Sequence, residues 1–82
     1  MQKTAIRGDR KLHKLRYWRE VVGLKQDDLA VLIGCKKANY CQKELGKTEI
    51  RRTEMLKIQS AINRRLAKNG HQTLTLDDIF LP

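Results

Sequence analysis

The chain has 82 residues, of which 40% are hydrophobic and 5% aromatic, and its formal net charge is +9. A chain of this length predicts one domain, because two pieces would each be too small to bury a core. The basic excess predicts a polyanionic partner, with nucleic acid ahead of an anionic membrane surface. No stretch has the length and apolar character of a membrane span or a secretory signal, so we expect a cytoplasmic protein and no membrane partner.

The positive charge is uneven along the chain. Residues 1–25 carry eight basic and two acidic side chains, whereas residues 26–50 balance and residues 51–82 add a net +3. The basic residues at the N-terminal end have two equally good interpretations, a solvated tail without a partner or a segment that contacts a ligand. The two cysteines, Cys35 and Cys41, lack the spacing of a metal site, so we expect reduced thiols.

The chain opens with residues 1–10, which lack periodicity and predict a flexible basic arm ahead of a single domain over residues 11–82. Residues 12–22 predict a helix, because its apolar side chains share one arc of roughly 120° on a helical wheel. These are Leu12, Leu15, Trp18 and Val22. Gly23 ends the helix. Arg19 falls inside the apolar arc, so its charge requires a partner.

Two short helices follow, separated by a glycine turn. Residues 26–33 predict the first, whose opening turn holds two acidic side chains that the helix dipole favours. Gly34 marks the turn. The next helix is expected over residues 37–45, ending at Gly46.

A longer helix is predicted next. Residues 50–52 have an extended pattern, and Thr53 is the expected N-cap of this helix. Its inner stripe is formed by Met55, Ile58, Ile62 and Leu66. Gln72–Leu76 fit a strand or a loop equally, and Thr75 is expected to cap a last short turn through Phe80. The predicted fold is therefore all-α, a compact bundle of four to five short helices.

With these elements, the chain resembles the lambda repressor/Cro-type helix-turn-helix family of transcription regulators. The similarity extends from about Leu15 to Ile62 and resumes at residues 76–80. The matching pieces are Gly23–Ala30, Ile33-Gly34, Glu44–Lys47, Leu56–Ile58, Ala61-Ile62 and Leu76–Phe80. The resemblance implies a helix-turn-helix DNA-binding domain and a sequence-specific regulator of the small phage or plasmid repressor type.

In this family the helix matched by residues 37–45 enters the major groove of double-stranded DNA. The resemblance implies base contacts from Lys36, Lys37, Ala38 and Gln42, and lysine and glutamine have the donors that guanine and adenine edges accept. It implies phosphate contacts from Lys25, Gln26, Asn39, Lys47, Arg51 and Arg52. The alternative for this set is a solvated polar helix face without a partner.

Family members pair a basic residue on the first helix with an acid at the end of the recognition helix, which implies a pair between Arg19 and Glu44. Other positions depart from the family pattern. Lys25 and Lys36 replace the usual Ser or Thr caps, each worth about 1 kcal/mol. Lys43 stands at an apolar position, where its stem packs while its ammonium group reaches water. Tyr40 replaces a β-branched residue and needs a hydroxyl partner.

The C-terminal region offers two interpretations. The helix extends beyond the family's usual end, and with the apolar residues after it forms either a homodimer surface or a cover for the core. The side chains concerned are Leu74, Leu76, Ile79, Phe80 and Leu81. A dimer would bind a palindromic operator.

Other classes of function remain as alternatives. An antitoxin-like or other protein-binding module uses the same fold, and a non-specific nucleic-acid binder needs only the charge. We do not expect an enzyme, because His13 and His71 lack an acid or nucleophile at a useful spacing. No cofactor, metal or small-molecule effector is predicted.

Overall fold

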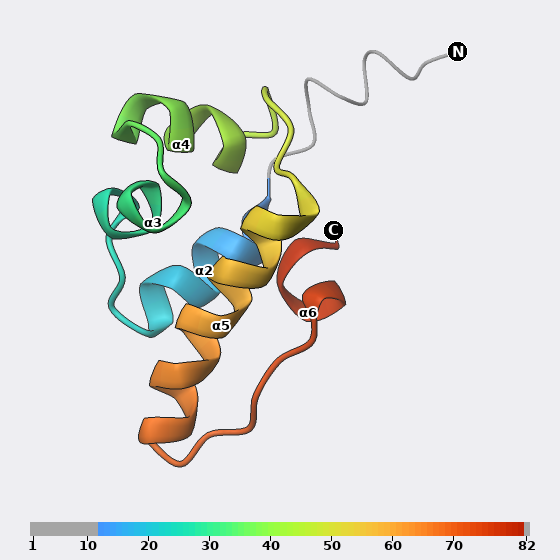
Figure 1. Ribbon diagram of the computed structural model, residues 1–82. Coiled ribbons are helices and arrows are strands. Elements are labelled where there is room, and N and C mark those ends of the chain that lie inside the picture. Colours follow the sequence, from blue (N-terminus) through green and yellow to red (C-terminus); the bar gives the residue numbers. More distant parts are fainter. Residues whose placement is uncertain (1–11, 82) are drawn as a thin grey trace.

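The computed structural model describes residues 12–81, and within them it contains five helices and no strand (Figure 1). The helices are α2 (His13–Val21), α3 (Gln26–Ile33), α4 (Lys37–Glu44), α5 (Arg52–Lys68) and α6 (Leu76–Phe80). This confirms the all-α prediction. The arm predicted at residues 1–10 lies outside the described residues.

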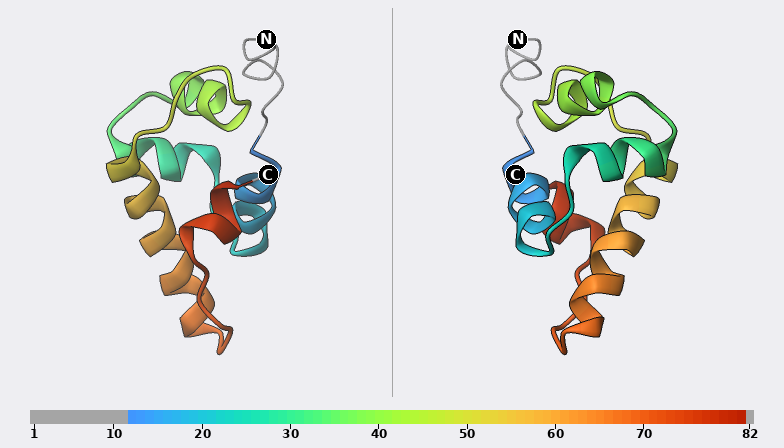
Figure 2. Two further views of the ribbon diagram at one scale, coloured as in Figure 1. Left: turned by 90° about the vertical axis from the view of Figure 1, so that its right-hand side faces the viewer. Right: turned by 90° about the vertical axis from the view of Figure 1, so that its left-hand side faces the viewer.

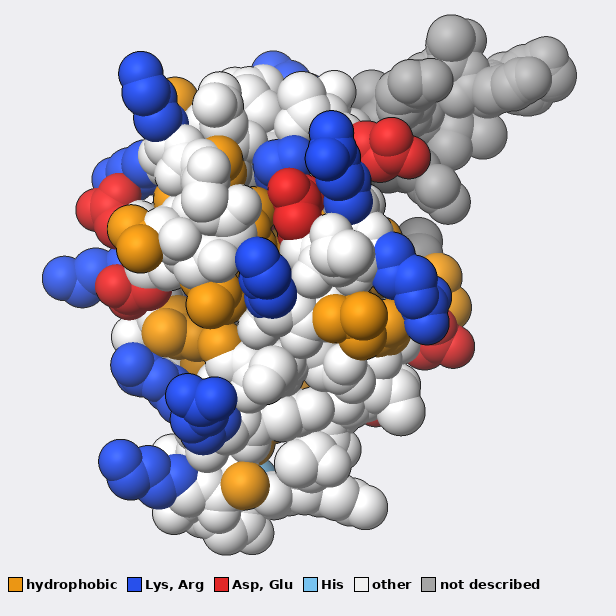
Figure 3. All heavy atoms as spheres, in the orientation of Figure 1, with side chains coloured by type: hydrophobic (Ala, Val, Ile, Leu, Met, Phe, Trp, Pro, Cys, Tyr) orange, Lys and Arg blue, Asp and Glu red, His pale blue; other side chains and the backbone are white. Residues whose placement is uncertain are grey.

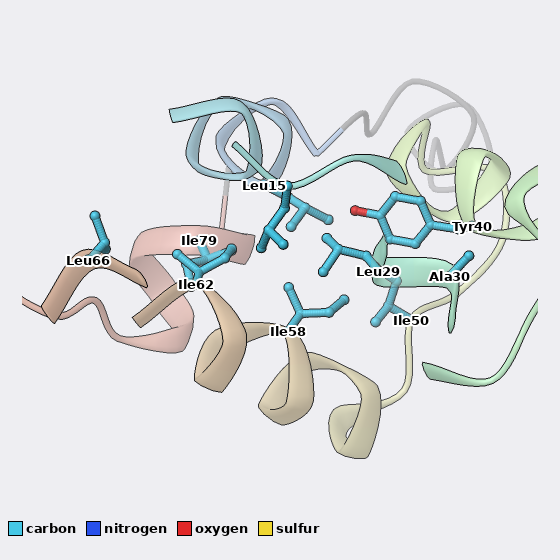
Figure 4. Packing of buried hydrophobic residues seen from close by; sticks show 10 residues of the cluster. Leu15, Leu29, Ala30, Tyr40, Ile50, Ile58, Ile62, Leu66 and Ile79 are labelled. Atoms are coloured by element: carbon cyan, nitrogen blue, oxygen red, sulfur yellow. The ribbon is translucent and has the colours of Figure 1, made fainter. Parts of the chain in front are cut away.

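The helices pack around one core. α3 contacts α4 and α5, while α6 packs on both α2 and α5. α4 lies at the end of the molecule beyond the N-terminus of α5, and the C-terminus of α5 marks the opposite end (Figures 1 and 2). The buried apolar side chains come from all five helices and their connections (Figure 4); they are Leu15, Leu24, Leu29, Ala30, Tyr40, Ile50, Ile58, Ile62, Leu66 and Ile79.

The helix boundaries correct several predictions. α2 is one residue shorter than expected at each end, and α4 ends at Glu44 rather than at Leu45. Thr53 was the wrong N-cap. α5 already begins at Arg52, because the carboxylate of Glu54 accepts the backbone N–H of Arg51 at 3.0 Å and so satisfies the start of the helix.

The cap predicted for the last helix is confirmed. The Thr75 hydroxyl accepts the N–H of Asp78 at 3.2 Å, and the Asp78 carboxylate accepts the N–H of Thr75 at 2.9 Å. These two bonds hold the pKa of Asp78 below its ordinary value. Gly34 ends α3 in the left-handed region with φ of 78°, which a side chain there would disfavour.

The segment between α5 and α6 is irregular, which resolves the strand-or-loop alternative for Gln72–Leu76 in favour of a loop that leads into α6. Two side chains of α5 hold it in place. The Asn63 amide both donates to the carbonyl of Leu74 at 2.9 Å and accepts its N–H at 2.8 Å, and Gln59 donates to the same carbonyl at 3.0 Å. Ile79 is fully buried as a result, so this residue covers the core, whereas Leu81 remains half-exposed.

None of the helices between residues 12 and 81 combines the length and the hydropathy that crossing a bilayer requires.

Candidate functional site

A buried ion pair joins α2 to the end of α4. The Arg19 guanidinium donates through Nε to one oxygen of Glu44 at 2.8 Å and through Nη2 to the other at 3.1 Å. Its Nη1 donates to the carbonyl of Leu24 at 3.0 Å. Arg19 is 7% exposed and Glu44 6%, so water screens this pair little. The arginine within the apolar arc of α2 thus has its partner 25 positions away in the sequence.

Glu44 accepts two further hydrogen bonds. The Tyr40 hydroxyl donates to it at 2.7 Å, and the side-chain amide of Gln26 donates at 3.0 Å. Tyr40 is fully buried, so this bond supplies the hydroxyl partner that the sequence required. The carboxylate of Glu44 therefore joins α2, the first residue of α3 and the last turn of α4, and we name these four side chains the Glu44 network.

The Glu44 network shifts the pKa of its members. Burial alone would raise the pKa of Glu44, but the hydrogen bonds from Arg19, Tyr40 and Gln26 together outweigh burial and lower it. The hydrogen bond to Glu44 raises the pKa of Arg19. Burial, with the adjacent carboxylate, raises the pKa of the Tyr40 hydroxyl. At neutral pH Arg19 and Glu44 are therefore charged and Tyr40 is neutral. Because the bonds to Glu44 come from α2 and α3, the network fixes the position of α4.

An open groove of about 630 Å³ lies between α2, α3 and α4. The residues predicted to contact DNA that line it are Lys25, Gln26 and Lys37. His13 and Arg16 of α2 line it as well, and sequence reasoning missed both. The signal was present, because these positions flank the apolar arc of α2 on the side of Arg19. Arg16 forms an exposed ion pair with Glu20 at 3.2 Å, a kind of contact that contributes little and is readily exchanged for another anion.

The remaining predicted contact residues lie outside the lining of this groove. Lys36, Ala38 and Asn39 are exposed at the start of α4, and Gln42 is partly buried one turn later. Lys47, Arg51 and Arg52 are exposed in the connection to α5 and at its first turn. The structure thus brings Lys25, Gln26 and Lys37 together, and spreads the others over the outer side of α4 and the connection that follows it.

The side chain of Gln26 differs from the sequence expectation. One hydrogen of its amide is used by Glu44, so the side chain is oriented by the protein before any ligand arrives. The backbone N–H of Asp28 donates to the carbonyl of Lys25 at 3.0 Å, whereas the first two N–H groups of α3, those of Gln26 and Asp27, have no carbonyl one turn back within the helix and can bind an anion. At this helix start the Asp28 carboxylate accepts the N–H of Lys25 at 2.8 Å, which offsets the absent Ser or Thr cap.

Lys43 also differs from expectation. Its ammonium group does not end in water. It donates to the carbonyl of Glu49 at 2.9 Å and lies 3.4 Å from the Glu54 carboxylate, and the side chain is only 16% exposed. This lysine therefore ties α4 to the connection and to the first turn of α5. Lys43 thus has a structural role.

The described residues contain no group of three or more His, Cys, Asp or Glu side chains arranged to hold a metal ion. Comparisons with protein-family models, with curated proteins and with solved structures found no match to this chain. The function must therefore be inferred from the residues and their geometry.

Proposed function

We propose that this protein is a sequence-specific, double-stranded DNA-binding transcription regulator in which α3 and α4 act as a helix-turn-helix and α4 enters the major groove. The observation that carries the proposal is the Glu44 network. It joins α4 to α2 and α3 from the protein side by three hydrogen bonds to Glu44, two from Arg19 and one from Gln26, while Tyr40 of α4 itself donates a fourth to the same carboxylate. The side chains of Lys37 and Ala38, at the start of the helix, are left exposed.

Side-chain chemistry supports a division of roles along this surface. Lys37 and Gln42 carry the donors that pair with guanine and adenine edges, and Ala38 is small enough to contact a thymine methyl group. The groove cations Arg16 and Lys25 can neutralise backbone phosphates, with the first turn of α3 supplying N–H groups. Such contacts position the protein without reading sequence, and they make affinity fall steeply with salt.

The decisive experiment is selection of bound duplexes from a random pool with the full chain. A regulator with a reading helix enriches a short motif, and a symmetric motif with half-sites about one helical turn apart would indicate a dimer. A pool without any enriched motif would instead support the non-specific binder. Failure to bind DNA, together with co-purification of a neighbouring small protein, would support the protein-binding module.

Two variants then separate base reading from phosphate contact. Gln42→Ala should cost about 1–3 kcal/mol on the selected duplex and relax one base preference, whereas Gln72→Ala, an exposed glutamine in the loop before α6, should change neither. Lys47→Ala should weaken selected and random duplexes alike and reduce the salt slope by about one unit. If Gln42→Ala weakened both duplexes equally, α4 would not be the reading helix.

A further inference from the structure

The outer face of α5 carries a row of cations that the proposed DNA site does not use. Lys57, Arg64 and Lys68 are separated by seven and four positions, which places them within roughly 40° of one another around the helix. All three are exposed, and in the described part of the chain none forms an ion pair. We name these three side chains the α5 basic stripe.

Folding does not require the α5 basic stripe. Arg64 and Lys68 are like charges four positions apart, an arrangement that destabilises a helix by about 0.2–0.5 kcal/mol. Lys68 gains something from the dipole at the helix C-terminus, but Lys57, in the first half of α5, does not. Arg65, one position from the stripe, has a structural task by contrast, since it donates to the carbonyl of Val22 at 3.1 Å.

Two residues of the stripe, Arg64 and Lys68, lie away from α4, whereas Lys57 is in the first half of α5. The C-terminal half of α5 is at the end of the molecule opposite α4 in each view (Figures 1 and 2). Figure 3 shows Lys and Arg side chains one above another at the lower left, beside this part of α5. Lys57 and Lys68 are about 16 Å apart along the helix axis. Arg64 and Lys68 therefore lie at the end of the molecule opposite the proposed DNA site.

We infer that the α5 basic stripe binds the phosphate backbone of a second DNA segment, so that the protein bridges two duplexes. Charge complementarity favours a polyanion, and the chemistry of the stripe favours nucleic acid over an acidic protein. Protein interfaces depend on buried aromatic or aliphatic anchors, whereas the exposed residues between these cations are Ser60, Arg65 and Ala67; the exposed large apolar side chain of α5, Leu56, precedes Lys57 and lies about 100° around the helix from it. Cations without apolar anchors or base-reading side chains suit contact with phosphates.

The test is a capture assay. A duplex that the protein binds is fixed to beads and saturated with protein, and capture of a labelled random duplex is then measured. The glutamine variant carries Lys57→Gln, Arg64→Gln and Lys68→Gln together. It should hold the first duplex like the parent and capture the second duplex at least tenfold less, which is roughly the loss that removing three phosphate contacts implies at moderate salt. The charge-conserving variant Lys57→Arg/Arg64→Lys/Lys68→Arg is the matched control and should capture normally.

The salt dependence of binding the second duplex provides a second readout. Three phosphate contacts should weaken binding of the second duplex about 40-fold between 50 and 200 mM salt. In titrations of the random duplex onto protein whose α4 surface is already occupied by the selected duplex, the glutamine variant should lose about 2.7 units of salt slope; if the selected duplex is not bound at all, a direct titration of the random duplex should show the same loss. Undiminished capture and an unchanged slope in this variant would overturn the inference and leave an acidic protein segment as the occupant. Failure of every protein to bind the selected duplex would instead refute the proposed function, and the slope would still test the stripe.

Discussion

The substitution Glu44→Ala removes the acceptor on which α2, α3 and α4 converge. It leaves the Arg19 guanidinium 7% exposed with the Leu24 carbonyl as its one remaining strong partner, while the nearest oxygen of Glu20 lies 3.9 Å away. It also leaves the buried hydroxyl of Tyr40 without an acceptor. Breaking a buried pair from one side costs about 3–5 kcal/mol, and the contact with Glu20 moderates this loss. We therefore expect a destabilisation of about 3 kcal/mol.

Thermal unfolding followed by circular dichroism measures this loss. In a domain of this size, 3 kcal/mol corresponds to a fall in melting temperature of roughly 15 °C. Glu49→Ala, which removes an exposed glutamate from the connection after α4, is the matched control and should melt like the parent. The double substitution Arg19→Met/Glu44→Leu should recover only part of the stability, because an apolar pair can replace a buried ion pair at little cost but the Tyr40 hydroxyl still lacks an acceptor.

DNA binding separates stability from the positioning of α4. At a temperature where Glu44→Ala is still folded, its affinity for the selected duplex should fall, because α4 has lost its attachment to α2 and α3. A melting temperature within about 4 °C of the parent would refute the reasoning, since a shift that small corresponds to less than 1 kcal/mol. The carboxylate would then contribute little to the free energy of unfolding.

Three further outcomes are expected. Because the pKa of Glu44 is lowered in the folded state, the ionised carboxylate stabilises the protein above the ordinary value of 4.5, and this stabilisation is lost as the pH falls through the folded-state pKa. The difference in unfolding free energy between the parent and Glu44→Gln should therefore shrink on acidification below 4.5. A constant difference would contradict the assigned shift. Tyr40→Phe should cost about 1–2 kcal/mol in urea unfolding, because Glu44 loses a buried donor, and an unchanged midpoint would show that this bond is not needed. Asn63→Ala should speed hydrogen exchange at the Leu74 amide and lower stability by about 1–2 kcal/mol, and undisturbed exchange at that amide would contradict its role.

The helices could be predicted from the sequence because their signals are local. Apolar spacing over residues 12–22 and the glycine after Ile33 depend on neighbours within a few positions, and both predicted the correct elements. The prediction of Thr75 as a helix cap was correct for the same reason, since its partner Asp78 is three positions away. The prediction of Thr53 as the N-cap was wrong because the side chain of Glu54, inside the first turn, binds the backbone N–H of Arg51 and so places the start of the helix earlier.

The site was less predictable because its contacts join distant residues. Helical periodicity showed that Arg19 faces inward, but the bond between Gln26 and Glu44 spans 18 positions and has no local signature. The same holds for Lys43, whose two partners belong to segments that only the tertiary fold brings near. Periodicity places His13 and Arg16 beside the apolar arc of α2, but the groove that they line exists only because the tertiary fold places α2 beside α3 and α4.

The position of α6 has a consequence for synthesis of the chain. Ile79 shares the core with Leu15, although the two lie near opposite ends of the described residues. While α6 is still inside the ribosome, the apolar side chains of α2 and α5 that pack on α6 are uncovered, and α2 is held only by its remaining contacts, among them those with α4. α2 in turn carries the Arg19 that anchors α4. In shortened chains that end before α6, α4 is therefore anchored to an α2 that has lost its packing against α6.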